Sequence, residues 1–150
     1  FFRVGVGSRG ESFHPHADNF VVYVVSLELV YLLFYHLDTY FCPVDDSCVV
    51  APLDASSSAS AELIRQLVLI LIEFPVKVAA GFACNAMPIG DHVVSSLTIS
   101  QLDAPLRAAG FTTMPLPMGE FLKAAGGLRC LSLPLGEVLH RIRAPRNAEA

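Results

Sequence analysis

The strongest constraint in this chain of 150 residues is a pattern that occurs twice: strand, tight turn, strand, helix, strand, with a period of roughly 45 residues. In the first copy, the sequence predicts strands at 34–42 and 48–51 around a turn. A helix then begins within the serine-rich stretch 56–60 and ends before Pro75, and residues 76–78 form the closing strand. Because one small unit cannot bury its own apolar face, we expect the units to pack around a common centre.

The second copy has the same order: strands at 82–89 and 92–95 around Gly90 and Asp91, a helix capped by Ser100 or Asp103 that ends at Gly110, and a closing strand at 111–116. Gly90 suits a two-residue hairpin, and Gly110 suits the left-handed end of a helix. Residues 4–7 and 128–133 predict further strands from partial copies. The chain is therefore interpreted as a run of similar modules.

Composition narrows the class of protein. Hydrophobic residues make up 53% and charged residues 16%, which favours one packed domain. The fourteen acidic residues outnumber the ten basic ones, so we expect no nucleic-acid partner. The apolar run 20–35 is shorter than the ~20 residues of a spanning helix and contains Glu28, so we expect no membrane insertion. The four cysteines lack C-x-x-C spacing, which favours a reducing, cytoplasmic environment.

The residues capable of chemistry fall in the predicted first strands of the units: His36 and Asp38, Cys84 and Asn85, and Cys130. Since these strands should converge, residues far apart in the sequence could meet. The two-residue period of a strand puts His36 and Asp38 on the same face. Cys130 would lie in a strand entered through Gly126 and Gly127, which let a ligand or backbone approach closely. A nucleophile beside an adaptable loop is therefore expected.

Several motifs together resemble the arginine deiminase, dimethylarginine dimethylaminohydrolase and amidinotransferase superfamily, over most of 4–135. They are Phe-Tyr-His-Leu-Asp-Thr at 34–39, Asn85-Ala86 before Gly90-Asp91, Glu-Phe-Leu-Lys-Ala at 120–124, and the segment 126–133. The resemblance implies a five-unit α/β propeller, the pentein fold, with the active site on its pseudo-symmetry axis. On this basis, residues 1–150 would be the C-terminal part of a single catalytic domain whose N-terminal units are missing. The expected fold is therefore an incomplete α/β propeller built from repeated ββαβ units.

The resemblance also implies roles for individual residues. Cys130 matches the nucleophilic cysteine and His36 the general acid and base. Asp38 matches a carboxylate that grips the guanidinium, and Arg9 matches an arginine that pairs with the substrate carboxylate. The chemistry is consistent, because a delocalised guanidinium is a poor electrophile that carboxylates must hold while a thiolate adds to its carbon. The cationic substrate itself favours the thiolate.

The implied function is a hydrolase that cleaves a C–N bond in the guanidino group of arginine or a methylated relative, through a covalent thiouronium on Cys130. Hydrolysis is favoured over amidino transfer. No cofactor is implied, the partner is a small arginine-like molecule, and a homo-oligomer is compatible with the pattern.

The alternative is a non-catalytic remnant that keeps the fold and binds a guanidino ligand or a partner subunit. The superfamily has a Glu-Gly-x-Asp strand whose acidic residues orient the histidine and bind the guanidinium, and nothing in this sequence matches it. That departure supports the alternative.

Structural explanations also compete with the chemical ones. Cys130 could be a core thiol, and His36 with Asp38 a structural hydrogen-bonded pair. Cys84 and Asn85 are interpreted as structural, without a catalytic role, and Cys42 and Cys48 as packing residues. A metal site formed by His14, His16, His36 and Asp38 is not expected, because no second pair has ligand spacing and loop histidines explain the pattern.

Overall fold

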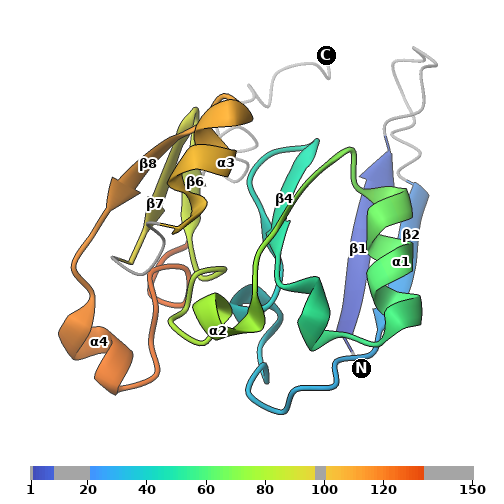
Figure 1. Ribbon diagram of the computed structural model, residues 1–150, viewed down its shortest axis with the longest axis horizontal. Helices are drawn as coiled ribbons and strands as arrows, with labels where there is room; N and C mark the ends of the chain where they lie inside the picture. The colour runs from blue at the N-terminus through green and yellow to red at the C-terminus, as the bar shows by residue number, and fades with distance from the viewer. Residues whose placement is uncertain (1, 9–20, 97–100, 134–150) are drawn as a thin grey trace, which may run out of the picture.

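The computed structural model describes residues 2–8, 21–96 and 101–133, and it is a mixed α/β arrangement of three small sheets that stand side by side (Figure 1). The first sheet pairs β1 (Phe2–Ser8) with β2 (Val21–Leu27) in antiparallel fashion. The predicted strand at 4–7 lies within β1. In the part of the chain that is described, no helix is long and apolar enough to cross a membrane.

The second sheet contains the first complete repeat. Its strands are β3 (Cys42–Pro43), β4 (Cys48–Ala51) and β5 (Ile70–Glu73), and the helix α1 (Ser58–Leu67) lies between the last two. β4 pairs antiparallel with β3 and parallel with β5. The unit is therefore ββαβ, as predicted, and the strand at 48–51 is confirmed.

The closing strand of this unit was predicted in the wrong place. Residues Val76–Ala79 form a short helix, α2, whereas the closing strand β5 begins at Ile70, where the helix was expected to continue. Apolar residues in 67–72 fit a helical face as well as a strand. Parallel pairing with β4, in the register Cys48 to Ile70, decides in favour of the strand.

The third sheet repeats the arrangement with β6 (Met87–Ile89), β7 (His92–Ser95), α3 (Asp103–Ala108) and β8 (Thr112–Pro115). β7 again pairs antiparallel with its hairpin partner and parallel with the strand after the helix. Gly90 and Gly110 both have positive φ, +61° and +94°, so the predicted turn and helix end are confirmed. Leu102 occupies the N-cap position of α3, and Ser100 lies outside the described residues.

Hydrogen bonds at the start of α1 tie the first sheet to the first complete repeat. The Ser57 hydroxyl caps the helix by accepting from the N–H of Ser60, at 3.4 Å. The Ser60 hydroxyl in turn accepts from the N–H of Glu28, one residue after β2, at 2.8 Å. The short helix η2 (Leu53–Ala55) precedes this junction.

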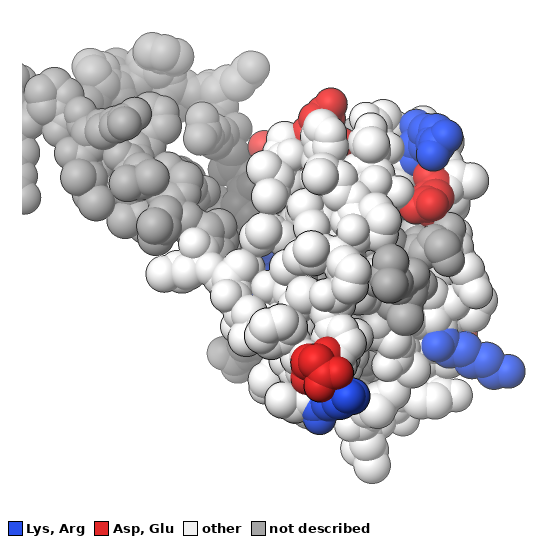
Figure 2. Space-filling model, turned by 90° about the vertical axis from the view of Figure 1, so that its left-hand side faces the viewer, with Lys and Arg blue, Asp and Glu red and all other residues white. Residues whose placement is uncertain are grey.

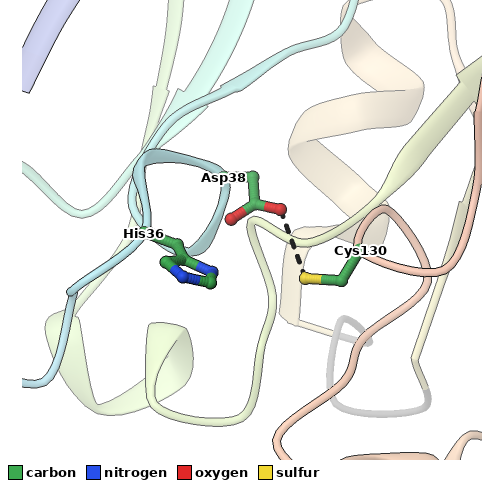
Figure 3. A group of neighbouring side chains, drawn as sticks. All are labelled: His36, Asp38 and Cys130. Carbon is green, nitrogen blue, oxygen red and sulfur yellow. Dashed lines mark hydrogen bonds between the residues drawn. The ribbon is translucent and has the colours of Figure 1, made fainter.

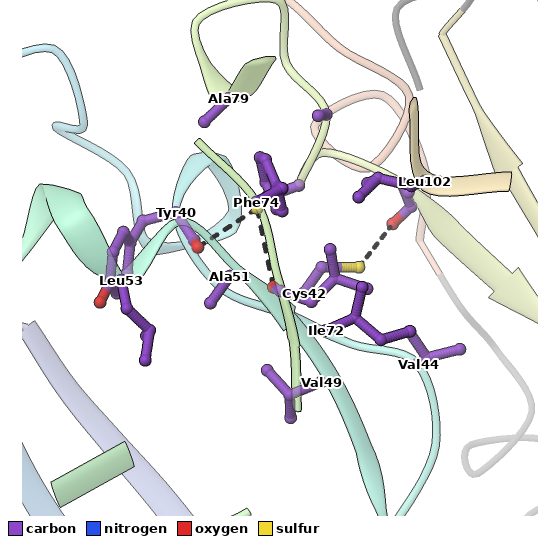
Figure 4. Packing of buried hydrophobic residues seen from close by; sticks show 14 of the residues in the cluster. Tyr40, Cys42, Val44, Val49, Ala51, Leu53, Ile72, Phe74, Ala79 and Leu102 are labelled. Carbon is purple, nitrogen blue, oxygen red and sulfur yellow. Dashed lines mark hydrogen bonds between the residues drawn. The ribbon is translucent and has the colours of Figure 1, made fainter. Parts of the chain in front are cut away.

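Buried side chains from both complete units form one core (Figure 4). Tyr40, Cys42 and Val50 are at most 2% exposed, and Ile72 of β5 and Leu102 before α3 belong to the same cluster. All four cysteines are free thiols. Because the residues just before β3 and β6 take part in this core, it fixes the segments that carry the candidate site.

The surface is poor in charge. On the face shown in Figure 2, acidic and basic groups are few and scattered among uncharged residues. Large apolar side chains are exposed in the segment 30–35, where Leu32 is 97% exposed. This segment leads directly into His36.

Candidate active site

The side chains of His36, Asp38 and Cys130 meet at one place, where one imidazole nitrogen, one carboxylate oxygen and the sulfur all lie within 4.8 Å of one another. Figure 3 shows the imidazole, the carboxylate and the thiol pointing toward a common space. The convergence expected from the repeat is therefore present for these three residues.

His36 and Asp38 are held by a turn and not by the predicted strand at 34–42. The carbonyl of His36 accepts from the N–H of Thr39 at 3.1 Å and from its hydroxyl at 2.6 Å. These local bonds form the short helix η1 (Leu37–Thr39), and only Cys42 of the predicted strand pairs in the sheet. The strand-period argument for placing His36 beside Asp38 was wrong, although the two side chains are close.

Cys130 is also held by a turn, so the predicted strand at 128–133 is wrong. The helix α4 (Gly119–Lys123) is followed by Ala125 in the left-handed conformation, with φ of 58°. The N–H of Leu131 then donates to the carbonyls of Gly127 and Leu128, each at 3.3 Å. The turn leaves the Cys130 side chain exposed, with its thiol donating to Oδ2 of Asp38 at 3.3 Å.

Sequence reasoning missed Asn85 as a site residue. Its Nδ2 donates to Oδ2 of Asp38 at 2.9 Å and to Sγ of Cys130 at 3.1 Å. Asn85 lies two residues before β6, and Asp38 lies four residues before β3. Two signals pointed to it: its place just before the first strand of a unit, next to Cys84, and the Asn85-Ala86 motif of the resemblance.

Asp38 and His36 differ in exposure: one carboxylate oxygen of Asp38 is buried, whereas the His36 side chain is exposed. Among the described residues, no donor reaches the buried Oδ1 of Asp38, which in Figure 3 lies on the side of His36. His36 is exposed, and its ring meets the Tyr35 ring edge-on with centroids 4.6 Å apart. One carboxylate oxygen of Asp38, without a partner, therefore lies toward the imidazole ring, and the other contacts the exposed thiol.

The other thiols close to the site are buried and differ from Cys130. Burial raises the pKa of Cys42 to about 11 and raises the pKa of Cys84 well above its ordinary value. The Cys84 thiol donates to the carbonyl of Tyr40 at 3.2 Å. These two cysteines are packing residues in the core.

A metal ion could also use the three grouped side chains, since imidazole, carboxylate and thiolate are all ligands of zinc. This set differs from the one considered from the sequence, of which His14 and His16 lie outside the described residues. Arg9, predicted to pair with a substrate carboxylate, also lies outside them.

Comparison with known proteins shows that this chain is similar to part of several longer proteins. No protein-family model matches the chain. The chain is 35% identical over 140 residues to the bifunctional arginine dihydrolase/ornithine cyclodeaminase ArgZ of Synechocystis sp., covering 89% of this chain and 19% of that protein. It is 36% identical to the dimethylarginine dimethylaminohydrolase of Mycobacterium tuberculosis, covering 75% of this chain and 37% of the relative.

A solved structure extends the likeness to the fold. A substituted form of the ArgZ N-terminal domain, covalently bound to a reaction intermediate, matches with a TM-score of 0.67 and 36% identity. The match covers 73% of this chain and 41% of that one. The chain thus spans less than half the length of each of these proteins and shares the mixed α/β fold of the part that it matches.

Proposed function

Since this chain is related by sequence to the guanidino-group-modifying enzymes, of which it spans a part, we propose that it cleaves a C–N bond in the guanidino group of arginine or a methylated arginine. The observation that carries this proposal is the distance of 3.3 Å between the Cys130 sulfur and the Asp38 carboxylate, with His36 alongside. A nucleophile beside an anion is what a cationic electrophile requires.

The carboxylate of Asp38 holds the substrate. Guanidinium N–H groups donate to a carboxylate in pairs, through short charge-assisted hydrogen bonds. Oδ1 of Asp38 has no donor among the described residues, and Oδ2 accepts from Asn85 and Cys130. Because Oδ1 is buried, a guanidinium that uses both oxygens must displace the groups that cover it. Binding there brings the guanidinium carbon to the sulfur, and its positive charge favours the thiolate.

The first half of the reaction then forms a covalent intermediate. After the thiol proton has passed to solvent water, the Cys130 thiolate forms a bond from sulfur to the guanidinium carbon, and the carbon's π electron pair moves onto nitrogen. His36, as imidazolium, gives a proton to one substituent nitrogen, and the C–N bond breaks to release an amine. The product on the protein is a thiouronium.

The second half consumes water. Neutral His36 takes a proton from a water molecule while the oxygen adds to the same carbon, and the C–S bond breaks to regenerate the thiolate. From arginine, the two halves release ammonia and a ureido product. His36 is suited to both proton transfers because its ring is accessible and within 4.8 Å of the other two groups.

We further propose that residues 1–150 form the C-terminal part of one α/β-propeller domain. Two consecutive ββαβ units, each with a site residue just before its first strand, support this arrangement. The match to 41% of the ArgZ domain supports a chain that corresponds to part of a longer domain.

A second candidate function is guanidinium binding without turnover. The chain has no Glu-Gly-x-Asp strand, and Asp38 is the one carboxylate in the His36 and Cys130 group among the described residues. Such a module would bind arginine at Asp38 and form no adduct.

The test is a search for the covalent intermediate. The protein is incubated with arginine or with asymmetric dimethylarginine, quenched in acid, and weighed intact by mass spectrometry. Both substrates must give the same added mass on Cys130, because ammonia leaves from one and dimethylamine from the other while the retained atoms are identical. A folded sample that binds arginine and forms no adduct would support the binding module, and Cys130→Ser is the control.

A further inference from the structure

Asn85 uses every hydrogen-bonding position of its carboxamide. Its two N–H bonds reach Oδ2 of Asp38 and Sγ of Cys130, and its Oδ1 accepts from the N–H of Arg129 at 2.8 Å and of Cys130 at 3.4 Å. The side chain is only 2% exposed. A buried amide satisfied in this way contributes to a fixed arrangement of its partners.

The direction of the amide is set by its surroundings. A backbone N–H can only donate, so the oxygen of Asn85 must face Arg129 and the nitrogen must face Asp38. An aspartate here could not donate to the carboxylate, and an aliphatic side chain would leave buried polar groups unpaired. Among the common side chains of this size, only asparagine supplies both an acceptor and two donors.

The backbone around Asn85 is built to hold the amide in place. Its N–H donates to the carbonyl of Phe82, a residue in the left-handed conformation with φ of 64°. On the opposite side, Gly127 packs directly against the amide, since a Cβ at this glycine would overlap Oδ1 of Asn85. The contact leaves no space for the amide to rotate toward Gly127.

Given the proposed function, we propose that Asn85 is a positioning residue, which holds the Cys130 sulfur beside the Asp38 carboxylate and stabilises the thiolate by donating to it. A thiolate next to a carboxylate is opposed by repulsion between like charges. One amide nitrogen that donates to both anions offsets this repulsion, and a hydrogen bond is stronger when its acceptor is charged. Asn85 therefore allows a nucleophile and a cation-binding group to share one site.

The test measures thiolate formation without any guanidino substrate. The rate of Cys130 alkylation by iodoacetamide is followed from pH 5 to 10 in the parent protein, in Asn85→Ala and in Asn85→Asp. We expect the rate at pH 7 to fall about tenfold in Asn85→Ala, as for the loss of one hydrogen bond to a charged group. The midpoint of the profile should move to higher pH, and further still in Asn85→Asp, which adds a negative charge.

Two further variants separate positioning from a general loss of structure. Gly127→Ala keeps the amide but displaces it, and should shift the profile in the same direction, which decides the question if Asn85→Ala does not fold. Ser56→Ala removes another buried polar group, whose hydroxyl donates to the carbonyl of Leu53 at 2.9 Å, and should leave the profile unchanged.

An unchanged profile in folded Asn85→Ala or in folded Gly127→Ala overturns the role of Asn85. The result is independent of the proposed function. If arginine forms no adduct and the profile shifts, the role of Asn85 stands while the guanidino chemistry fails. If the adduct forms and the profile does not shift, the guanidino chemistry stands and the role of Asn85 fails.

Discussion

The sulfur of Cys130 lies 3.3 Å from Oδ2 of Asp38, although 92 residues separate them in the chain. The Asn85 amide donates to both atoms. Three segments, one before each of two hairpins and one after α4, are joined through this contact. The site therefore depends on how the repeated units pack together, and not on any one segment.

Cys130 should be the one thiol that reacts in the folded protein. It is exposed, whereas Cys42, Cys48 and Cys84 are each at most 1% exposed. Mass spectrometry after brief treatment with iodoacetamide at pH 7.5 should show a single modification, absent in Cys130→Ser. Four modifications are expected in denaturant. Rapid labelling of a second cysteine without denaturant would contradict the buried core described above.

High pH should destabilise the protein through its buried thiols. Burial raises the pKa of Cys42 to about 11, above that of an unfolded cysteine near 8.5. The folded state thus holds this proton more tightly, so the stabilisation is complete below about pH 8.5 and is lost as the pH rises toward 11. Urea unfolding between pH 8 and 10.5 should show a shallower loss of unfolding free energy in Cys42→Ala than in the parent. Equal slopes would argue against the raised pKa.

Ile64 should matter for stability far more than its exposed neighbours. It is 2% exposed, on the face of α1 that packs into the core. Truncation to alanine leaves a cavity, and Ile64→Ala should lower the free energy of unfolding by about 2–5 kcal/mol. Gln66→Ala, on the exposed side of the same helix, should change it by less than about 0.5 kcal/mol. Urea unfolding measures both, and similar values for the two would contradict the packing of α1.

His36 should be needed for adduct formation from arginine but not for reaction of the thiol with a neutral electrophile. Its ring is exposed, so His36→Gln should leave the fold intact. Because the departing amine needs a proton and iodide does not, this variant should lose the arginine adduct by about a hundredfold or more in rate, and keep alkylation by iodoacetamide within about threefold. Equal losses in both reactions would assign His36 to thiolate formation.

The repeat could be predicted from the sequence wherever turn residues and strand pattern agree. Cys48–Ala51 and His92–Ser95 are strands as predicted, and Gly90 and Gly110 adopt the positive φ expected of them. The closing strand Ile70–Glu73 was missed, since a short apolar run does not distinguish a strand from a helical face.

The sequence identified three residues that lie together in the candidate site, but not the backbone conformation that holds them. His36, Asp38 and Cys130 were selected by motif and by position in the repeat, and the structure brings them together. They lie in turns that local hydrogen bonds hold, as at Thr39, and strand periodicity does not describe such turns. Asn85 was not recognised, because its partners are 44 to 47 residues away and no local pattern reports them.

The most direct test of the account compares two alkylating agents at Cys130, 2-chloroacetamidine and 2-chloroacetamide. They have the same leaving group and nearly the same size, but the amidine carries a delocalised positive charge like that of a guanidinium. The rate constant for alkylation of Cys130 by each reagent is divided by the rate constant of the same reagent with glutathione. The ratio should be larger for the amidine by about tenfold or more, and Asp38→Asn should remove this preference. No preference in the parent protein, or an equal preference in Asp38→Asn, would contradict a guanidinium site formed by Asp38 and Cys130.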